Sequence, residues 1–269
     1  MDQPGPLLVL AAGQRCGSTL IQRLLCSHPQ VRIWGEHAGQ LRPLPAVGQR
    51  LARWSESSGM AGRQELDRHG HQGFIANLMP ERSAVDAACI AFVESLFAAP
   101  ARAQGRPIWG FKEVHYRLSD VLTLRRLLPG VRVITLVRDP RHVLRSLDEW
   151  ERHGGWTRTR TEQALRLWAE VASSFLPAAD DPGLREFVLP IRYEDLVSFS
   201  HGWTEAIAGH CRLDPSQLDE AVFAEKVHTA GPRGRATRAL REWSALPTSL
   251  RALVDDEIVT VASAYGYDL

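Results

Sequence analysis

Residues 7–25 read LLVLAAGQRCGSTLIQRLL, and this stretch decides the fold. It opens with an apolar run, Leu7 to Ala12, of the length expected for a fully buried parallel strand. Gly13 and Gly17 then bracket a tight turn. The residues that follow place their apolar side chains at helical spacing: Leu20, Ile21, Leu24 and Leu25. The stretch therefore predicts a strand, a glycine turn and a helix in direct succession.

A strand, turn and helix of this kind can bind an anion. Backbone N–H groups converge on the turn, the helix dipole adds positive charge, and the Ser18 and Thr19 hydroxyls donate hydrogen bonds. Arg15 supplies a full charge. ATPase phosphate loops carry a lysine where this chain has Gly17, so the triphosphate-and-magnesium machinery is missing. The alternative is a plain strand-to-helix connection in which Ser18 or Thr19 caps the helix.

Composition narrows the class of protein. The 269 residues fit one large domain, and an apolar content of 44% is ample for its core. A net charge of +1 gives no general attraction for nucleic acid or membranes. The chain has no signal-peptide pattern, no membrane-length apolar run and no metal or disulfide spacing among its cysteines, which are Cys16, Cys26, Cys89 and Cys211. We expect a soluble, cytoplasmic protein without a metal, while the oligomeric state stays open.

Further strands and helices alternate along the chain. Strands are expected at 31–34, 108–114, 131–137 and 187–191, and helices at 118–128, 140–152 and 162–175. Residues 37–105 read as mostly helical, with a polar loop between about Gly59 and Gly73. The pattern predicts an α/β fold, a parallel sheet of about five strands flanked by helices, with a helical insertion at about 40–105.

Charged and hydroxyl side chains follow the predicted strands at their carboxyl ends, where parallel sheets bind ligands. The residues found there are Arg15, Ser18, Thr19, Glu36, Lys112, Arg138 and Asp139. Lys112 is one of only two lysines among the 32 lysines and arginines of the chain. An acid, a lysine and two arginines are therefore expected to line one crevice.

At this point the sequence resembles the sulfotransferases that use 3′-phosphoadenosine-5′-phosphosulfate (PAPS). Residues 14–20, QRCGSTL, look like the 5′-phosphosulfate loop of that family, commonly PRSGTTL, with Gln14 for the proline and Cys16 for the serine. Residues 136–141, LVRDPR, followed by Ser146, resemble the block in which an arginine and a serine eight residues later grip the 3′-phosphate.

Other segments look most like the branch that contains tyrosylprotein sulfotransferases. They are His28–Arg32 with Gly35-Glu36, Arg192–Leu196, Arg238–Trp243 and Tyr265–Asp268. The resemblance covers the chain except for roughly residues 40–105, where acceptor specificity would lie.

The resemblance implies a role for each site residue. The donor-binding set would be Arg15, Cys16, Gly17, Ser18, Thr19, Leu20, Arg138, Ser146, Tyr193, Arg235 and Arg238. The catalytic set would be Glu36, Lys112 and Arg15, with Lys112 stabilising the departing phosphate and Glu36 as the general base. The alternatives are structural: Lys112 paired with Glu113 or another acid, Glu36 paired with an arginine, and Arg138 in a surface salt bridge with Ser146 an ordinary helical serine.

Two histidines compete with Glu36 as the base. Cytosolic sulfotransferases carry a Lys-x-His pattern, whereas here His115 follows Lys112 by three residues. If the strand continues, those two side chains point to opposite faces. His37 is the third candidate.

These features predict a PAPS-dependent sulfotransferase that releases PAP and acts on a hydroxyl or phenol of a small molecule. Tyrosine sulfation of a peptide is an alternative. A P-loop small-molecule kinase and a non-catalytic PAP-binding module are the others, although Gly17 argues against the kinase.

Overall fold

The structure is a computed structural model that describes residues 5–152, 157–224 and 240–269. Its centre is a sheet of five strands in the order β2-β3-β1-β4-β5, and every adjacent pair is parallel. The strands are β1 (Leu7–Ala11), β2 (Val31–Trp34), β3 (Ile108–Glu113), β4 (Arg132–Val137) and β5 (Val188–Arg192). The predicted parallel α/β fold is confirmed.

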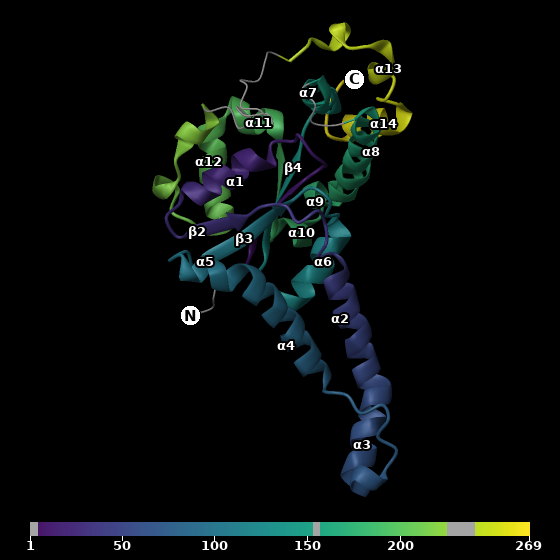
Figure 1. Cartoon of the computed structure of the whole chain (residues 1–269). Helices are drawn as coiled ribbons and strands as arrows, with labels where there is room; N and C mark the ends of the chain where they lie inside the picture. The colour runs from purple at the N-terminus through teal and green to yellow at the C-terminus, as the bar shows by residue number, and fades with distance from the viewer. Residues whose placement is uncertain (1–4, 153–156, 225–239) are drawn as a thin grey trace.

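Helices cover both faces of the sheet (Figure 1). Because parallel crossovers are right-handed, α1 (Ser18–Ser27) lies on one face, and α6 (Leu118–Leu127) and α8 (Arg158–Phe175) lie on the other. All five residues of β1 are buried, as expected for a central strand covered on both sides. The remaining α-helices after β4 are α7 (Pro140–Arg152), α9 (Pro177–Asp180), α10 (Pro182–Arg185), α11 (Tyr193–Ser198), α12 (Ser200–Cys211), α13 (Thr248–Arg251) and α14 (Asp256–Ala264).

The adjacent strands β1 and β4 lead into helices on opposite faces of the sheet. A crevice forms where neighbouring strands diverge in this way. The loop after β1 and the residues Arg138-Asp139 after β4 therefore meet at one edge. Asp139 fixes the start of α7, because its Oδ1 accepts the Arg141 N–H at 2.8 Å.

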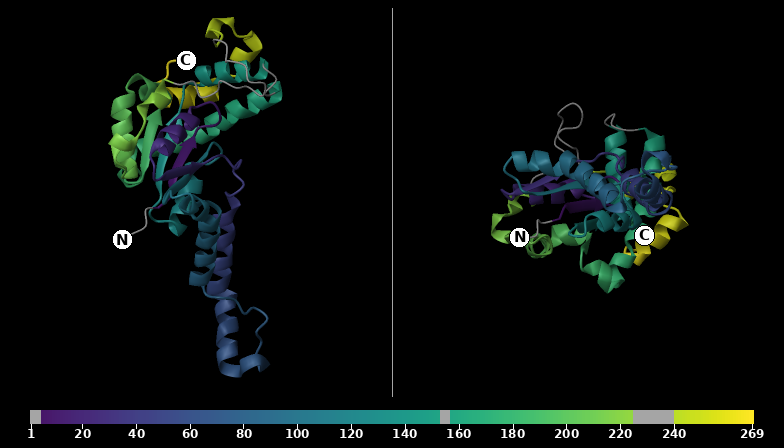
Figure 2. Two further views of the ribbon diagram at one scale, coloured as in Figure 1. Left: turned by 60° about the vertical axis from the view of Figure 1, so that its left-hand side comes forward. Right: turned by 90° about the horizontal axis from the view of Figure 1, so that it is seen from below.

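The segment between β2 and β3 forms a long helical hairpin, here called the arm. Helix α2 (Pro43–Trp54) continues through a π-helical turn, η1 (Ser55–Gly59), into α3 (Met60–His69). The chain returns through the 3₁₀ turn η2 (Gly70–Gln72), α4 (Arg82–Val93), η3 (Glu94–Ala98) and α5 (Ala99–Ala103). Figures 1 and 2 show the arm projecting well away from the sheet.

The predicted loop between Gly59 and Gly73 is wrong. The helix runs through Gly59 to His69, and the irregular connection lies at residues 70–81. A Cβ at Gly62 would lie 2.7 Å from the backbone nitrogen of Leu78, and one at Gly48 would lie 2.6 Å from Cys89 Sγ. These two glycines let the outgoing and returning chains approach closely and do not break the helix.

One described helix, the continuous stretch Arg82–Ala103, has the length and apolar character of a membrane span, with a hydropathy of 1.6. A third of that window is buried within the protein. Phe97, Ala98 and Ala101 join the core at the end of this helix that lies next to β3.

Candidate functional site

The loop after β1 contains three residues with a left-handed backbone conformation. Gly13, Arg15 and Gly17 have φ values of 72°, 68° and 96°. At Gly17 a Cβ would lie 2.4 Å from the ring of Tyr193, so the position has no room for a side chain. The sequence therefore needs glycine where α1 begins, and the ring of Tyr193 lies against it.

The N-terminus of α1 has the properties of an anion site. Its N-cap residue is Gly17, its first turn contains no acid, and no side chain of the described residues caps it. The alternative in which Ser18 or Thr19 caps the helix is therefore wrong. The first-turn N–H groups and the helix dipole carry positive charge that no acid in that turn offsets.

Two residues of the predicted phosphosulfate loop, Cys16 and Leu20, can contribute little to ligand binding through their side chains. Cys16 Sγ points back to the carbonyl oxygen of Ala12 at 2.9 Å, and burial raises the pKa of this thiol to about 12. The side chain of Leu20 is in the core, and its N–H donates to the Gly17 carbonyl at 2.9 Å. Any contact of Cys16 with a ligand would therefore come from its backbone.

The two predicted arginines meet. Arg15 Nε donates to Ser146 Oγ at 2.8 Å, and Arg138 Nη1 donates to the Arg15 carbonyl at 3.0 Å. The Arg138 guanidinium carbon lies 4.2 Å from the centroid of the Tyr193 ring, a cation–π contact. Arg15 after β1, Arg138 after β4, Ser146 on α7 and Tyr193 at the start of α11 thus form one cluster beside α1.

The two guanidinium groups of this cluster lie close enough to affect each other's ionisation. Burial lowers the pKa of Arg15, and the nearby charge of Arg138 lowers it further, while Glu149 opposes the shift. Arg138 Nε is buried and has no hydrogen-bond partner among the described residues. Buried polar groups are normally paired, so two adjacent guanidiniums with an unused donor fit an anionic ligand such as a phosphate.

Lys112 and Glu36 lie in direct contact. Lys112 is on β3 and nearly buried, and its Nζ forms an ion pair with Glu36 Oε1. The Glu36 side chain is 37% exposed, so one side of its carboxylate is open. For Lys112, this ion pair matches the structural alternative of pairing with an acid, although the acid is Glu36 and not Glu113. For Glu36, the partner is a lysine and not the arginine of its structural alternative.

Sequence reasoning missed the role of Glu113. This fully buried carboxylate accepts the N–H groups of His37 at 2.8 Å and Gly39 at 3.0 Å on one oxygen. Its other oxygen accepts the N–H groups of Val114 at 2.9 Å and His115 at 3.2 Å. Burial raises the pKa of Glu113, but these bonds and the His115 ring outweigh it and lower the pKa to about 2. The only signal in the sequence was an acid next to Lys112.

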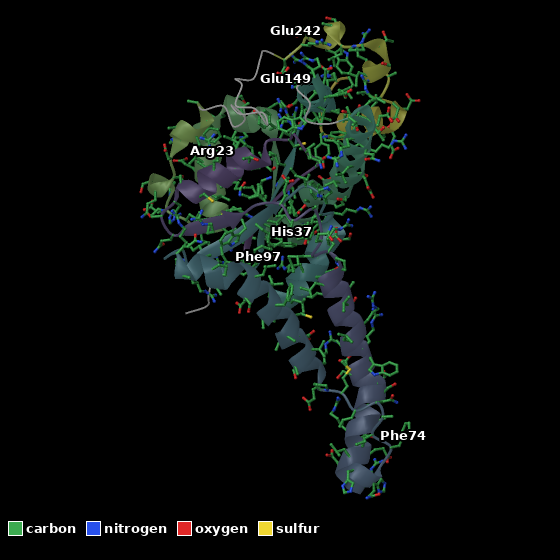
Figure 3. All side chains as sticks on the ribbon, viewed as in Figure 1. Arg23, His37, Phe74, Phe97, Glu149 and Glu242 are labelled. Atoms are coloured by element: carbon green, nitrogen blue, oxygen red, sulfur yellow. The ribbon has the colours of Figure 1, made fainter. Side chains whose placement is uncertain are left out.

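Neither rival histidine lies in contact with Lys112. His37 points into an aromatic cluster at the base of the arm, with ring centroids 5.1 Å from Phe111 and 5.7 Å from Tyr116 (Figure 3). Both of its ring nitrogens are buried without a hydrogen bond among the described residues, and burial lowers the pKa of the ring. His115 Nδ1 lies 3.1 Å from Glu113 Oε2. The strand ends at Glu113, so the condition of a continuing strand is not met at His115.

Three predicted donor-binding residues remain. Tyr193 is the first residue of α11, directly after β5. Arg235 and Arg238 lie outside the described residues. No group of three or more His, Cys, Asp or Glu side chains that could hold a metal ion occurs in the described ranges.

Comparisons with known proteins agree with this geometry. Residues 6–217 match the model of the sulfotransferase family. The sulfotransferase domain of the Synechococcus PCC 7002 olefin synthase is 17% identical with a TM-score of 0.55, over 100% of this chain and 97% of that one. The sulfotransferase domain from the curacin biosynthetic pathway is 18% identical with a TM-score of 0.55, over 99% of each chain.

A third similar structure is the mouse sulfotransferase SULT7A1 in complex with PAP. It is 12% identical with a TM-score of 0.51, over 97% of this chain and 84% of that one. At these identities the structures establish the fold alone. The family match covers most of the chain and both arginine blocks, and the protein therefore belongs to the sulfotransferase family.

Proposed function

We propose that this protein transfers a sulfuryl group from PAPS to a hydroxyl or phenol of a small molecule and releases PAP. The observation that carries the proposal is the cluster of Arg15, Arg138 and Ser146 beside the uncapped start of α1. This cluster contains anion-binding groups from both segments that carry the resemblance, residues 14–20 and residues 136–146.

Each part of this cluster has a separate task. The N-terminus of α1, with Ser18, Thr19 and Arg15, would hold the 5′-phosphosulfate, since N–H dipoles and a guanidinium suit a multiply charged anion. Arg138 and Ser146 would hold the 3′-phosphate, which would pair the unused Nε of Arg138. Tyr193, Arg235 and Arg238 are assigned to the nucleotide by resemblance.

When bound, PAPS would supply an activated sulfuryl group for transfer to the acceptor oxygen, with PAP as the leaving group. Glu36 would take the proton from the acceptor hydroxyl on its exposed side. Lys112 would offset the negative charge that develops on the departing phosphate. Catalysis would rest on positioning and on fixed charge, without a metal.

The acceptor class rests on the resemblance and on Glu36, whose partly exposed carboxylate suits a hydroxyl or phenol that must lose its proton. The resemblance to tyrosylprotein sulfotransferases keeps peptide tyrosine as the second candidate. The four free cysteines support a reducing compartment, and we propose the cytoplasm.

An acceptor screen tests the proposal. The protein is incubated with PAPS and a panel of phenols, alcohols and tyrosine peptides, and PAP release is measured beside a Glu36→Gln variant. Acceptor-dependent release that the variant loses would support the enzyme. PAP binding without turnover on any acceptor would support the non-catalytic module, and transfer from ATP with Mg²⁺ would support the kinase.

A further inference from the structure

The arm exposes an unusual number of large apolar side chains. In the described chain they include Val47, Leu51, Trp54, Met60, Leu66, Phe74, Leu78, Phe92 and Leu96, with Trp54 and Phe92 each 50% exposed. Phe74 extends into solvent at the tip (Figure 3). Single exposed apolar residues are ordinary, but a contiguous group marks an interaction surface.

Helical geometry gathers seven exposed residues of the arm on one side. Val47, Leu51 and Trp54 follow i, i+4, i+7 spacing on α2. A second exposed row on α4 and η3 follows i, i+4 spacing and consists of Ala84, Ala88, Phe92 and Leu96. Because α2 and α4 run antiparallel and face each other through Gly48 and Cys89, both rows project from the same side. These seven residues are called the arm face.

We infer that the arm face is a homodimer interface in which α4 packs antiparallel to α4 of a second copy. The row on α4 carries small side chains, Ala84 and Ala88, toward the tip and large ones, Phe92 and Leu96, toward the sheet. A twofold axis between Ala88 and Phe92 places Ala88 of one copy opposite Phe92 of the other. It likewise places Ala84 opposite Leu96. The surface is thus self-complementary, which an isologous interface requires.

Charge favours a second copy over a lipid surface. Residues 43–103 contain six arginines, no lysine and six acidic residues, so the arm is formally neutral. Two neutral arms do not repel each other. Anionic lipid is recognised by clusters of basic residues, and this balance of charges gives the arm no such excess.

Sedimentation equilibrium of the full chain tests the inference. We expect the wild type at about twice the chain mass, and Leu96→Glu at the mass of one chain with an unchanged far-UV circular dichroism spectrum. The control is Val197→Glu on α11, because Val197 has the same 46% exposure as Leu96 but lies off the arm. It should remain dimeric. A monomeric wild type, or a dimeric Leu96→Glu, would overturn the inference.

Cross-linking tests the antiparallel arrangement separately. Ala84 and Leu96 are twelve residues apart, about 18 Å along a helix. Oxidation of a mixture of Ala84→Cys and Leu96→Cys chains should link the two variants to each other, and neither should link to itself. Self-linking of Ala84→Cys would instead indicate parallel helices and overturn the antiparallel dimer. Flotation of a monomeric wild type with neutral vesicles would assign the arm face to lipid and overturn it as well.

Discussion

The carboxylate of Glu113 accepts the backbone N–H of His37 at 2.8 Å and so anchors the loop that carries Glu36. Lys112, the residue before Glu113, contacts the Glu36 side chain directly. Two consecutive residues at the end of β3 therefore hold the backbone and the carboxylate of the same loop. The proposed base and the lysine are positioned by one strand end.

Replacing Glu113 should impair catalysis without removing a group that touches substrate. In Glu113→Gln one oxygen becomes an NH₂ group, which cannot accept the N–H groups it faces. We expect kcat to fall by roughly 100-fold, the cost of a displacement of about 1 Å, while PAP affinity is retained. Steady-state kinetics and PAP titration check this. Glu94→Gln, an exposed acid on the arm, is the control, and a Glu113→Gln enzyme with full kcat would contradict the positioning role.

Glu113 should also make folding stability depend on pH. Its pKa in the folded protein, about 2, lies below the reference value of 4.5, so folding favours the ionised form. The stabilisation is complete above about pH 4.5 and is lost as the pH falls toward 2, at most about 3 kcal/mol. Urea unfolding at several pH values should show a steeper acid loss in wild type than in Glu113→Gln. Equal slopes would contradict the assignment.

Removing the proposed base should separate catalysis from binding. Glu36→Gln keeps the size of the side chain and an oxygen that can accept from Lys112, but the amide cannot take a proton. We expect turnover to fall by about 10²- to 10⁴-fold with PAP affinity unchanged. His115→Gln is the comparison. If His115→Gln loses turnover and Glu36→Gln does not, His115 is the base.

Gly17 should not tolerate even a methyl group. Gly17→Ala would require a left-handed φ of 96° and would bring Cβ to 2.4 Å from the Tyr193 ring. We expect a loss of roughly 1–3 kcal/mol of stability together with weaker PAP binding. Gly209→Ala is the matched control, because a Cβ there meets nothing within 4 Å. It should be neutral or slightly stabilising, and equal melting temperatures for both variants would contradict the packing argument.

The sequence predicted what local patterns determine. Arg15 and Arg138 could be placed together because each follows a buried strand of a parallel sheet. The role of Glu113 could not be predicted, because the N–H groups of His37 and Gly39 reach it only through the tertiary fold. The glycine-rich stretch between Gly59 and Gly73 predicts a loop, whereas Gly62 lies inside α3. Whether a glycine breaks a helix or admits a neighbour depends on contacts, here with Leu78, that its own sequence neighbourhood does not contain.

Calorimetric titration with PAP, beside ATP with Mg²⁺, tests the central claim most directly. We predict that the wild type binds PAP with micromolar affinity, that Arg138→Ala abolishes this binding, and that ATP with Mg²⁺ gives no response. Arg145→Ala, on the same helix as Ser146, should bind PAP like the wild type. No binding of PAP, or a preference for ATP with Mg²⁺, would contradict the account.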